Sequence, residues 1–191
     1  MRMTVKPITK IFRNCLLVAA LFVVTGFDTK QKSTISLEQQ VKAVFLFNFA
    51  QFVEWPATAF LEPNSPIVIG ILGKDPFGSF LQETIENEQV NGRPLIIQRY
   101  SSVAEVKSCH ILFIHASVAP KLDAILKALK GKQILTVSDL NNFAKQGGMV
   151  RFVKESNKVK LRINVNAAKA EGITISSKIL RLSEIVNSDE S

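Results

Sequence analysis

The chain has 191 residues, of which 47% are hydrophobic, and it carries 24 basic and 16 acidic side chains. This composition is typical of a globular protein and differs from that of a disordered chain. The net charge of +8 comes from basic residues that form no cluster interleaved with aromatic side chains, so the composition does not favour binding to nucleic acid.

Residues 1–26 have the pattern of a secretory signal peptide. Four basic residues and no acidic residue precede an uninterrupted run of apolar and small residues from Cys15 to Gly26. We expect cleavage before Phe27, which lowers the net charge from +8 to +4 and leaves a periplasmic protein with no stable membrane insertion. An uncleaved membrane anchor is the alternative. A polar leader, 27–36, precedes the folded region.

The run from Val41 to Pro56 contains four of the thirteen Phe residues and the Trp. It is shorter than the roughly 20 apolar residues of a membrane span and is interrupted by polar residues, which favours a helix in a soluble core over a membrane element. Ser36 is the predicted N-cap, and Pro56 ends the helix. Phe47 falls on the polar side. The predicted apolar stripe comprises Leu37, Val41, Val44, Phe45, Phe49, Phe52 and Trp55.

Strands alternate with helices through the middle of the chain. We predict strands at 66–72, 94–99, 109–115 and 133–137, and helices at 75–86, 121–130 and 140–145, with a short helix from 102. Several of these strands are apolar on both faces. The pattern therefore predicts an α/β fold with a mostly parallel sheet covered by helices.

The C-terminal part departs from this alternation. An antiparallel hairpin is predicted from 148–153 and 158–165, followed by helices at 166–171 and 177–186. Residues 37–186 are enough for a single domain with its own core, and a polar tail, 187–191, follows it.

No catalytic, metal-binding or cofactor-binding constellation is predicted. The turn from Gly70 to Asp75 matches neither a phosphate loop nor a dinucleotide fingerprint, and it is predicted as a tight turn capped by Asp75. Cys109 and His110 point to opposite faces of a predicted strand, whereas Cys109 and His115 share a face about 20 Å apart. Because Cys109 is the only cysteine after the leader, the cleaved chain cannot form an internal disulfide.

The polar face of the predicted hairpin is the candidate partner-binding site. Alternation places Arg151, Lys160, Arg162 and Asn164 opposite an apolar face. A solvated outer face is the default interpretation, and a recognition face is the functional alternative. Phe47 is added as a candidate exposed aromatic contact on the first helix.

The chain resembles the YfiR-like family of exported proteins over residues 38–186. The phrases that carry the resemblance are KAVFLFNFAQFVEWP, IVIGILGKDPFG, NGRPL, CHILFI, ILTVSD, FAKQGGMVRFV and LRINVNAAKAEGITISSKILRLSEIV. The resemblance implies an exported α/β domain that lacks catalysis and tends to form homodimers. It also implies a periplasmic repressor that binds the periplasmic domain of an inner-membrane diguanylate cyclase or sensor protein, and so lowers cyclic-di-GMP signalling and biofilm formation.

Some members of that family contain additional cysteines that form structural disulfides, and this chain lacks them. The resemblance therefore predicts a regulatory protein without an internal redox bridge and without a cofactor. The alternative is a periplasmic sensor that binds a small ligand at the carboxyl ends of the strands. A further alternative is an exported enzyme acting through Cys109, His115 or Ser138.

Overall fold

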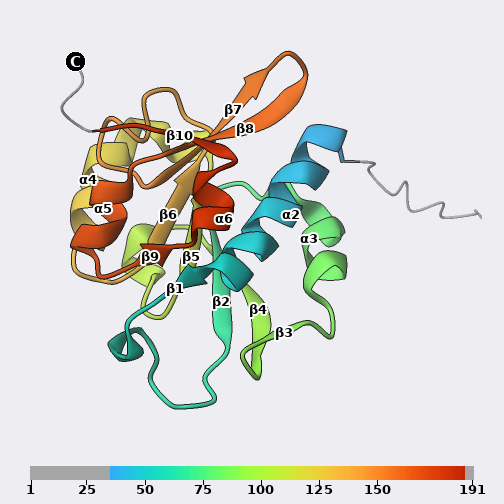
Figure 1. The fold of residues 1–191 in the computed structure, drawn as a ribbon, viewed down its shortest axis with the longest axis vertical. Coiled ribbons are helices and arrows are strands. Elements are labelled where there is room, and N and C mark those ends of the chain that lie inside the picture. Colours follow the sequence, from blue (N-terminus) through green and yellow to red (C-terminus); the bar gives the residue numbers. More distant parts are fainter. Residues whose placement is uncertain (1–34, 188–191) are drawn as a thin grey trace, which may run out of the picture. The chain divides into compact units, whose positions relative to one another are not determined.

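The computed structural model describes residues 35–187, which fold around a mixed sheet covered by helices (Figure 1). The predicted signal peptide, most of the polar leader and most of the polar tail lie outside the described residues. The strands are β1 (Val53–Glu54), β2 (Ile67–Leu72), β3 (Gln89–Val90), β4 (Arg93–Tyr100), β5 (Ile111–Ile114), β6 (Leu135–Ser138), β7 (Val150–Glu155), β8 (Lys158–Ile163), β9 (Thr174–Ile175) and β10 (Ser183–Ile185). The helices are α2 (Leu37–Phe52), α3 (Gly78–Ile85), α4 (Leu122–Leu129), α5 (Val165–Ala170) and α6 (Ser177–Leu180), with 3-10 turns η1 (Ala57–Ala59), η2 (Val103–Glu105) and η3 (Ala116–Lys121).

The main sheet of the described region has the strand order β10-β8-β7-β6-β5-β2-β4-β3. Its neighbours are parallel except for the β7–β8 and β3–β4 pairs, which are antiparallel. A second, two-stranded sheet pairs β1 with β9 and so joins the end of α2 to the C-terminal part of the chain. The predicted fold class, a mostly parallel α/β sheet with a C-terminal antiparallel hairpin, is confirmed.

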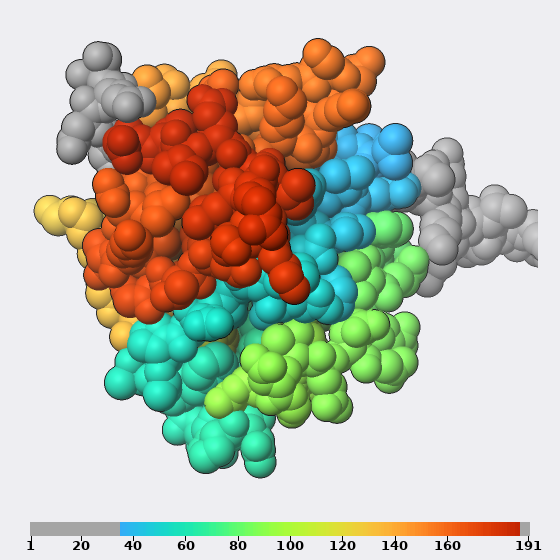
Figure 2. Space-filling view, viewed as in Figure 1, coloured from blue at the N-terminus to red at the C-terminus, as the bar shows by residue number. Residues whose placement is uncertain are grey.

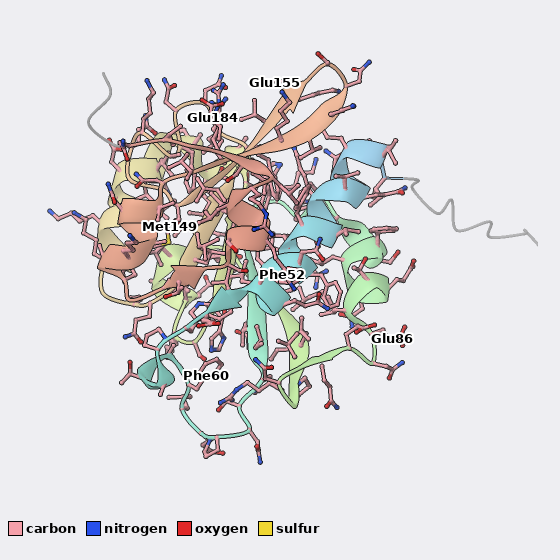
Figure 3. The ribbon with its side chains drawn as sticks, viewed as in Figure 1. Phe52, Phe60, Glu86, Met149, Glu155 and Glu184 are labelled. Carbon is pink, nitrogen blue, oxygen red and sulfur yellow. The ribbon has the colours of Figure 1, made fainter. Side chains whose placement is uncertain are left out.

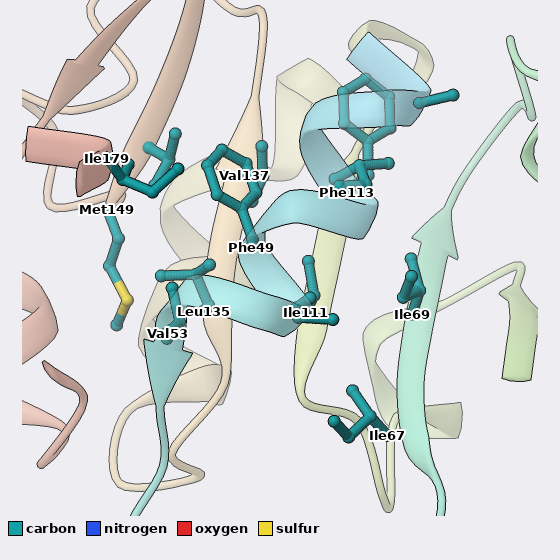
Figure 4. Close-up of a cluster of buried hydrophobic side chains, with 14 of the residues drawn as sticks. Phe49, Val53, Ile67, Ile69, Ile111, Phe113, Leu135, Val137, Met149 and Ile179 are labelled. Atoms are coloured by element: carbon teal, nitrogen blue, oxygen red, sulfur yellow. The ribbon is translucent and has the colours of Figure 1, made fainter. Parts of the chain in front are cut away.

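Both faces of the sheet are buried, as the doubly apolar strands require. Strand β2 shows this directly, because Ile69 lies in one hydrophobic cluster and Val68 lies in another. The first cluster contains side chains of α2, α3, α5 and α6, and Figure 4 shows its centre around Phe49, Phe113 and Val137. The second cluster contains the apolar face of α4. Helices therefore close the sheet on both sides.

Helix α2 begins as predicted but buries a different face. The Ser36 hydroxyl accepts a hydrogen bond from the Gln39 N–H at 3.3 Å, which confirms the N-cap. The buried side chains are Lys42, Ala43, Leu46, Phe49 and Ala50. Two members of the predicted stripe are exposed instead, Leu37 by 74% and Val44 by 41%. A helix that is apolar around most of its circumference does not reveal its core face by periodicity, and this part of the prediction was wrong.

Two further predictions failed near the C-terminus. Residues 140–145 form consecutive turns instead of a helix. The predicted helix over 177–186 stops after α6, and Ser183–Ile185 pair with β8 as the parallel edge strand β10. The Val186 N–H also donates to the Ile163 carbonyl at 3.0 Å, so the sheet extends further than local helical spacing indicated.

The hairpin itself forms as predicted. Ser156 and Asn157 have φ of +48° and +60°, the combination that a tight two-residue turn between antiparallel strands requires. Gly147 before β7 has φ of +95°, and a Cβ on Gly148 would collide with the ring of Phe143. These two glycines therefore allow the chain to enter β7 close against the second cluster.

Candidate partner-binding surface

The β7–β8 hairpin extends beyond the sheet. Strand β7 pairs with β6 only through Val150 and Arg151, and β10 reaches β8 only from Leu161 onward. Residues 152–160 therefore form a two-stranded arm, and neither of its outer edges pairs with another strand of the described chain. Figure 1 shows this arm above the remainder of the sheet, beside the start of α2. An exposed strand pair of this kind is accessible to a second protein.

The arm has two different faces, which the strand register defines. The inner face, toward α2, contains the pairs Phe152–Leu161 and Lys154–Val159. The outer face contains the pairs Arg151–Arg162, Val153–Lys160 and, at the tip of the arm, Glu155–Lys158. The register thus separates an inner, largely apolar face from an outer, charged face.

Arg162 is the centre of the outer face. Its Nε donates to the Glu184 carboxylate at 2.9 Å, and its Nη2 donates to Glu155 at 3.3 Å. Lys160 donates to the other Glu155 oxygen at 2.7 Å, and this hydrogen bond is the main cause that lowers the pKa of Glu155. Figure 3 labels Glu155 on the arm and Glu184 on β10. The two carboxylates therefore neutralise much of the positive charge that the sequence places on this face.

Arg151 lies directly opposite Arg162 in the register and is partly buried. Its Nη2 donates to the Asn141 side-chain oxygen at 2.6 Å, whereas its Nε is buried and has no hydrogen-bond partner among residues 35–187. Burial, and then the charge of Arg162, lower the pKa of Arg151. Arg151 anchors the base of the face and presents less of its guanidinium to solvent than Lys160 presents of its ammonium.

The five predicted contact residues do not form one surface. Arg151, Lys160 and Arg162 lie together on the outer face of the hairpin. Asn164 does not, because its side chain is fully buried, and the prediction that it lies on an exposed face was wrong. Its Oδ1 accepts the Ala167 N–H as the N-cap of α5, and its Nδ2 donates to the Ala144 carbonyl at 2.9 Å. The alternation of strand β8 ends at Ile163, because the next residue, Asn164, is the N-cap of helix α5.

Phe47 lies elsewhere, on α2. It is partly buried and packs against the first hydrophobic cluster. The ring is therefore part of the packing that holds α2 to the sheet, and its role as an exposed contact stays a prediction.

A buried lysine connects α2 to the sheet and to the arm. Lys42, 4% exposed, forms ion pairs with Glu38 at 2.7 Å and with Asp139 at 2.8 Å. Burial opposes its charge, but hydrogen bonds to Asp139 and Glu38 outweigh burial and raise the pKa of Lys42. Lys154 on the inner face of the arm pairs with the second Glu38 oxygen at 3.1 Å. A Lys that interrupts an apolar run is the one trace of this network in the sequence.

The side chains considered for catalysis are each engaged in local structure. The Cys109 thiol is buried, which raises its pKa to about 12. His115 Nδ1 accepts the Ser117 N–H at 3.0 Å, and the Ser138 hydroxyl donates to the Ile114 carbonyl at 2.7 Å. No hydrogen bond joins these three side chains within residues 35–187. The geometry therefore offers no activated nucleophile among them.

His110 has a structural environment of its own. Its ring stacks on Phe60 at 4.5 Å between centroids, and the Arg93 guanidinium lies 3.8 Å from the centroid of the Phe60 ring. His110 Nδ1 accepts the Val68 N–H at 3.0 Å, whereas the buried Nε2 has no hydrogen-bond partner in the described part of the chain. Burial lowers the pKa of His110 to about 4. The neutral ring therefore holds the loop after η1 against the sheet, through its stacking on Phe60 and its hydrogen bond from Val68.

The η3 turn fills the position just beyond β2 and β5, where an α/β sheet usually binds a ligand. The switch in strand order falls between β2 and β5, beyond the ends of which lie Gly73 and His115. Ser117 of η3 packs there so closely that a Cβ on Gly73 would lie 2.5 Å from its hydroxyl oxygen. The same hydroxyl accepts the Lys74 N–H at 3.0 Å. The small-ligand alternative therefore gains no support at this position.

The described residues contain neither a metal-ligand cluster nor a membrane-spanning helix. No group of three or more His, Cys, Asp or Glu side chains in this part of the chain could hold a metal ion. Among the helices that the structure describes, none has both the length and the hydropathy of a membrane span.

Sequence reasoning missed Glu155 and Glu184 as members of the outer face. The hairpin over 148–153 and 158–165 is predicted, but the pattern does not assign the Glu155 carboxylate in its connection to Lys160 or Arg162. Glu184 could be placed only with the knowledge that 183–185 form a strand beside β8. A surface predicted as cationic is therefore a mixed-charge surface.

These features define a class of protein, an α/β domain with a mostly parallel sheet and a protruding charged arm. Within that class, a family model described as YfiR/HmsC-like matches residues 39–184, and the chain belongs to this family. The family that the sequence resembles is thereby confirmed. No curated protein matches the chain.

Two solved structures share a limited likeness with the chain. A crystal structure described as the ABC domain in complex with L-Trp, from Streptococcus pneumonia, is 12% identical with a TM-score of 0.47, covering 63% of this chain and 55% of the other. A conserved domain protein from Vibrio cholerae O1 biovar eltor is 14% identical with a TM-score of 0.47, covering 62% and 54%. The chain thus spans about half the length of these structures.

Proposed function

We propose that this chain is a non-catalytic periplasmic regulatory protein that represses an inner-membrane diguanylate cyclase, and so lowers cyclic-di-GMP signalling and biofilm formation. The observation that carries the proposal is the match of the YfiR/HmsC-like family model to residues 39–184. Export to the periplasm rests on the signal-peptide pattern of residues 1–26.

The structure supports a binding role through its protruding arm. Regulation by contact needs a surface that another protein can reach, and the arm presents two unpaired strand edges and a mixed-charge face. Charges of both signs, held in fixed ion pairs, orient a partner more than they add affinity. A homodimer is part of the proposal, with its surface unassigned.

Deletion of the gene tests the proposed function. The expected result is a rise in cellular cyclic-di-GMP and in surface attachment, because loss of a repressor releases the cyclase. Wild-type chain supplied from a plasmid should restore both, and a matched chain lacking residues 1–26 should restore neither, because it stays in the cytoplasm. Unchanged cyclic-di-GMP in the deletion strain would reject the cyclase role.

A further inference from the structure

An apolar groove lies between the first turns of α2 and the inner face of the arm. Its volume is about 610 Å³. The apolar walls come from Leu37, Val41 and Phe45 on α2 and from Val159 on β8. The charged lining residues are Glu38, Lys154 and Lys158, and Lys158 borders the groove from the tip of the arm. Figure 2 shows the two elements side by side at one edge of the molecule. This groove is a different surface from the charged outer face, on the opposite side of the same hairpin.

The apolar character of the groove continues onto open surface. Leu37 is 74% exposed, and Val44, two helical turns further along α2, is 41% exposed. Scattered exposed apolar residues are ordinary, but these two continue the stripe that Val41 and Phe45 begin inside the groove. The i, i+4, i+7 spacing is that of a helix face which receives another element.

The charges around the groove favour an acidic occupant. Glu38 is already shared between Lys42 and Lys154, and Asp139 is paired with Lys42. Lys158 has no ion pair within the described residues, so its ammonium is free to meet an incoming carboxylate. The N-terminal end of α2 adds a positive partial charge on the same side. The groove is therefore apolar inside and positive at its edge.

Charge also argues against two other occupants. The chain that precedes the groove carries Lys30 and Lys32 against a single acid, Asp28, so its own leader has the wrong sign. A second copy docked groove to groove would bring the two Lys158 ammonium groups toward each other. Neither arrangement places an acidic group opposite the Lys158 ammonium.

We propose that this groove binds an amphipathic segment of the protein partner, with an apolar side chain seated among Leu37, Val41 and Phe45 and a carboxylate facing Lys158. The inference rests on the proposed function for the identity of the partner, and it adds the surface and the chemistry of the segment. A helix or an extended strand laid along α2 would cover the exposed stripe and the arm together.

Site-specific cross-linking in living cells tests the proposal with the full chain. A benzophenone amino acid replaces Leu37, which is exposed enough to tolerate it, and in a matched control it replaces Leu61, which is 84% exposed on the η1–β2 loop. The expected result is a cross-link from position 37, absent from position 61, to a segment that contains apolar residues at helical or strand spacing and at least one acid. Cross-linking only to a second copy of the chain, or only to lipid, overturns the proposal.

Charge exchange makes the result specific. Lys158→Glu should lower the yield of the cross-link at least about tenfold, and changing the acid of the captured segment to Lys should restore it. A yield that Lys158→Glu leaves unchanged overturns the role assigned to Lys158.

The outcomes also separate this inference from the proposed function. Capture at position 37 of an acidic amphipathic segment in a protein other than a cyclase or sensor supports the groove and contradicts the cyclase role. Capture of a diguanylate cyclase by the same probe at Lys160, with no heteromeric product at position 37, supports the cyclase role and overturns the groove.

Discussion

The ion pairs on the two sides of the β7–β8 hairpin differ in how deeply they are buried. On the outer face, Arg162 and Lys160 are paired with Glu155 and Glu184 at the surface, where each pair contributes little to stability. On the inner side, Lys42 is buried and its pairs with Glu38 and Asp139 hold α2 in place. The inner side therefore sets the shape of the proposed groove, whereas we expect the outer face to influence how a partner approaches it.

The largest expected effect comes from breaking the buried pair. Lys42→Ala removes the ion pair of Asp139 and leaves Glu38 paired only with the exposed Lys154, and we expect a loss of about 3 kcal/mol in the free energy of unfolding. Denaturant titration measures it. Lys154→Ala, which removes the exposed end of the same network, is the control and should cost less than about 1 kcal/mol. Equal losses for the two variants would contradict the distinction between buried and exposed pairs.

The pH dependence of stability separates the core from the hairpin. The pKa of His110 is lowered from its ordinary value of 6.5 to about 4, so the unfolded chain binds the proton more tightly than the folded one. The stability that neutral His110 contributes should therefore be fully present above pH 6.5. As the pH drops from 6.5 to 4, the free energy of unfolding should fall by up to about 3 kcal/mol.

Glu38 acts in a lower range, because hydrogen bonds from Lys42 and Lys154 lower its pKa below 4.5. Its contribution is present above that value and is lost as the pH falls through the pKa of the folded state. Replacement of His110 by Gln should abolish the loss between pH 6.5 and 4 and leave the loss at lower pH. A His110→Gln chain that still loses stability in the upper range would contradict the assignment.

A smaller effect is expected from the centre of the outer face. Arg162→Gln removes two ion pairs that are partly exposed, and the free energy of unfolding should fall by about 1 kcal/mol or less. Arg99→Gln breaks the exposed pair with Asp75 at 2.8 Å on the other side of the sheet and serves as the control. Thermal unfolding of both variants checks the prediction, and a loss at Arg162 as large as that at Lys42 would reject the view that this face only tunes approach.

The smallest expected effect concerns the rate of partner binding. Lys160→Glu reverses an exposed charge on the outer face, and it should slow association by about threefold at low salt while changing dissociation little. Stopped-flow or surface-resonance kinetics at two salt concentrations measures this. A large change in the dissociation rate would show that the outer face contributes to the affinity of the complex and not only to the rate of association.

Much of the fold could be predicted because the strands are short apolar runs bounded by clear turns. Asn91 and Gly92, for example, both have positive φ in the turn between β3 and β4. The face of α2 could not be predicted, because apolar residues surround most of that helix. Strand β10 was also missed, since Ile179, Leu182 and Val186 have spacing that suits a helix until β8 offers an edge to pair with.

The candidate site was predictable only in part. Alternation correctly brought Arg151, Lys160 and Arg162 to one face, since the side-chain period of a strand is fixed. It failed at Asn164, where the strand ends and the side chain caps a helix. The groove on the inner side depends on the packing of α2 against the arm, residues more than 100 positions apart, and local sequence contains no direct signal for such a contact.

The most direct test of the account is the dissociation constant of the purified chain for the periplasmic domain of its cross-linked partner, compared between Leu37→Glu and Lys160→Glu. If the inner groove supplies the affinity, Leu37→Glu weakens binding at least about tenfold, whereas Lys160→Glu weakens it less than about threefold. The opposite order would contradict the account and place the binding site on the outer face of the hairpin.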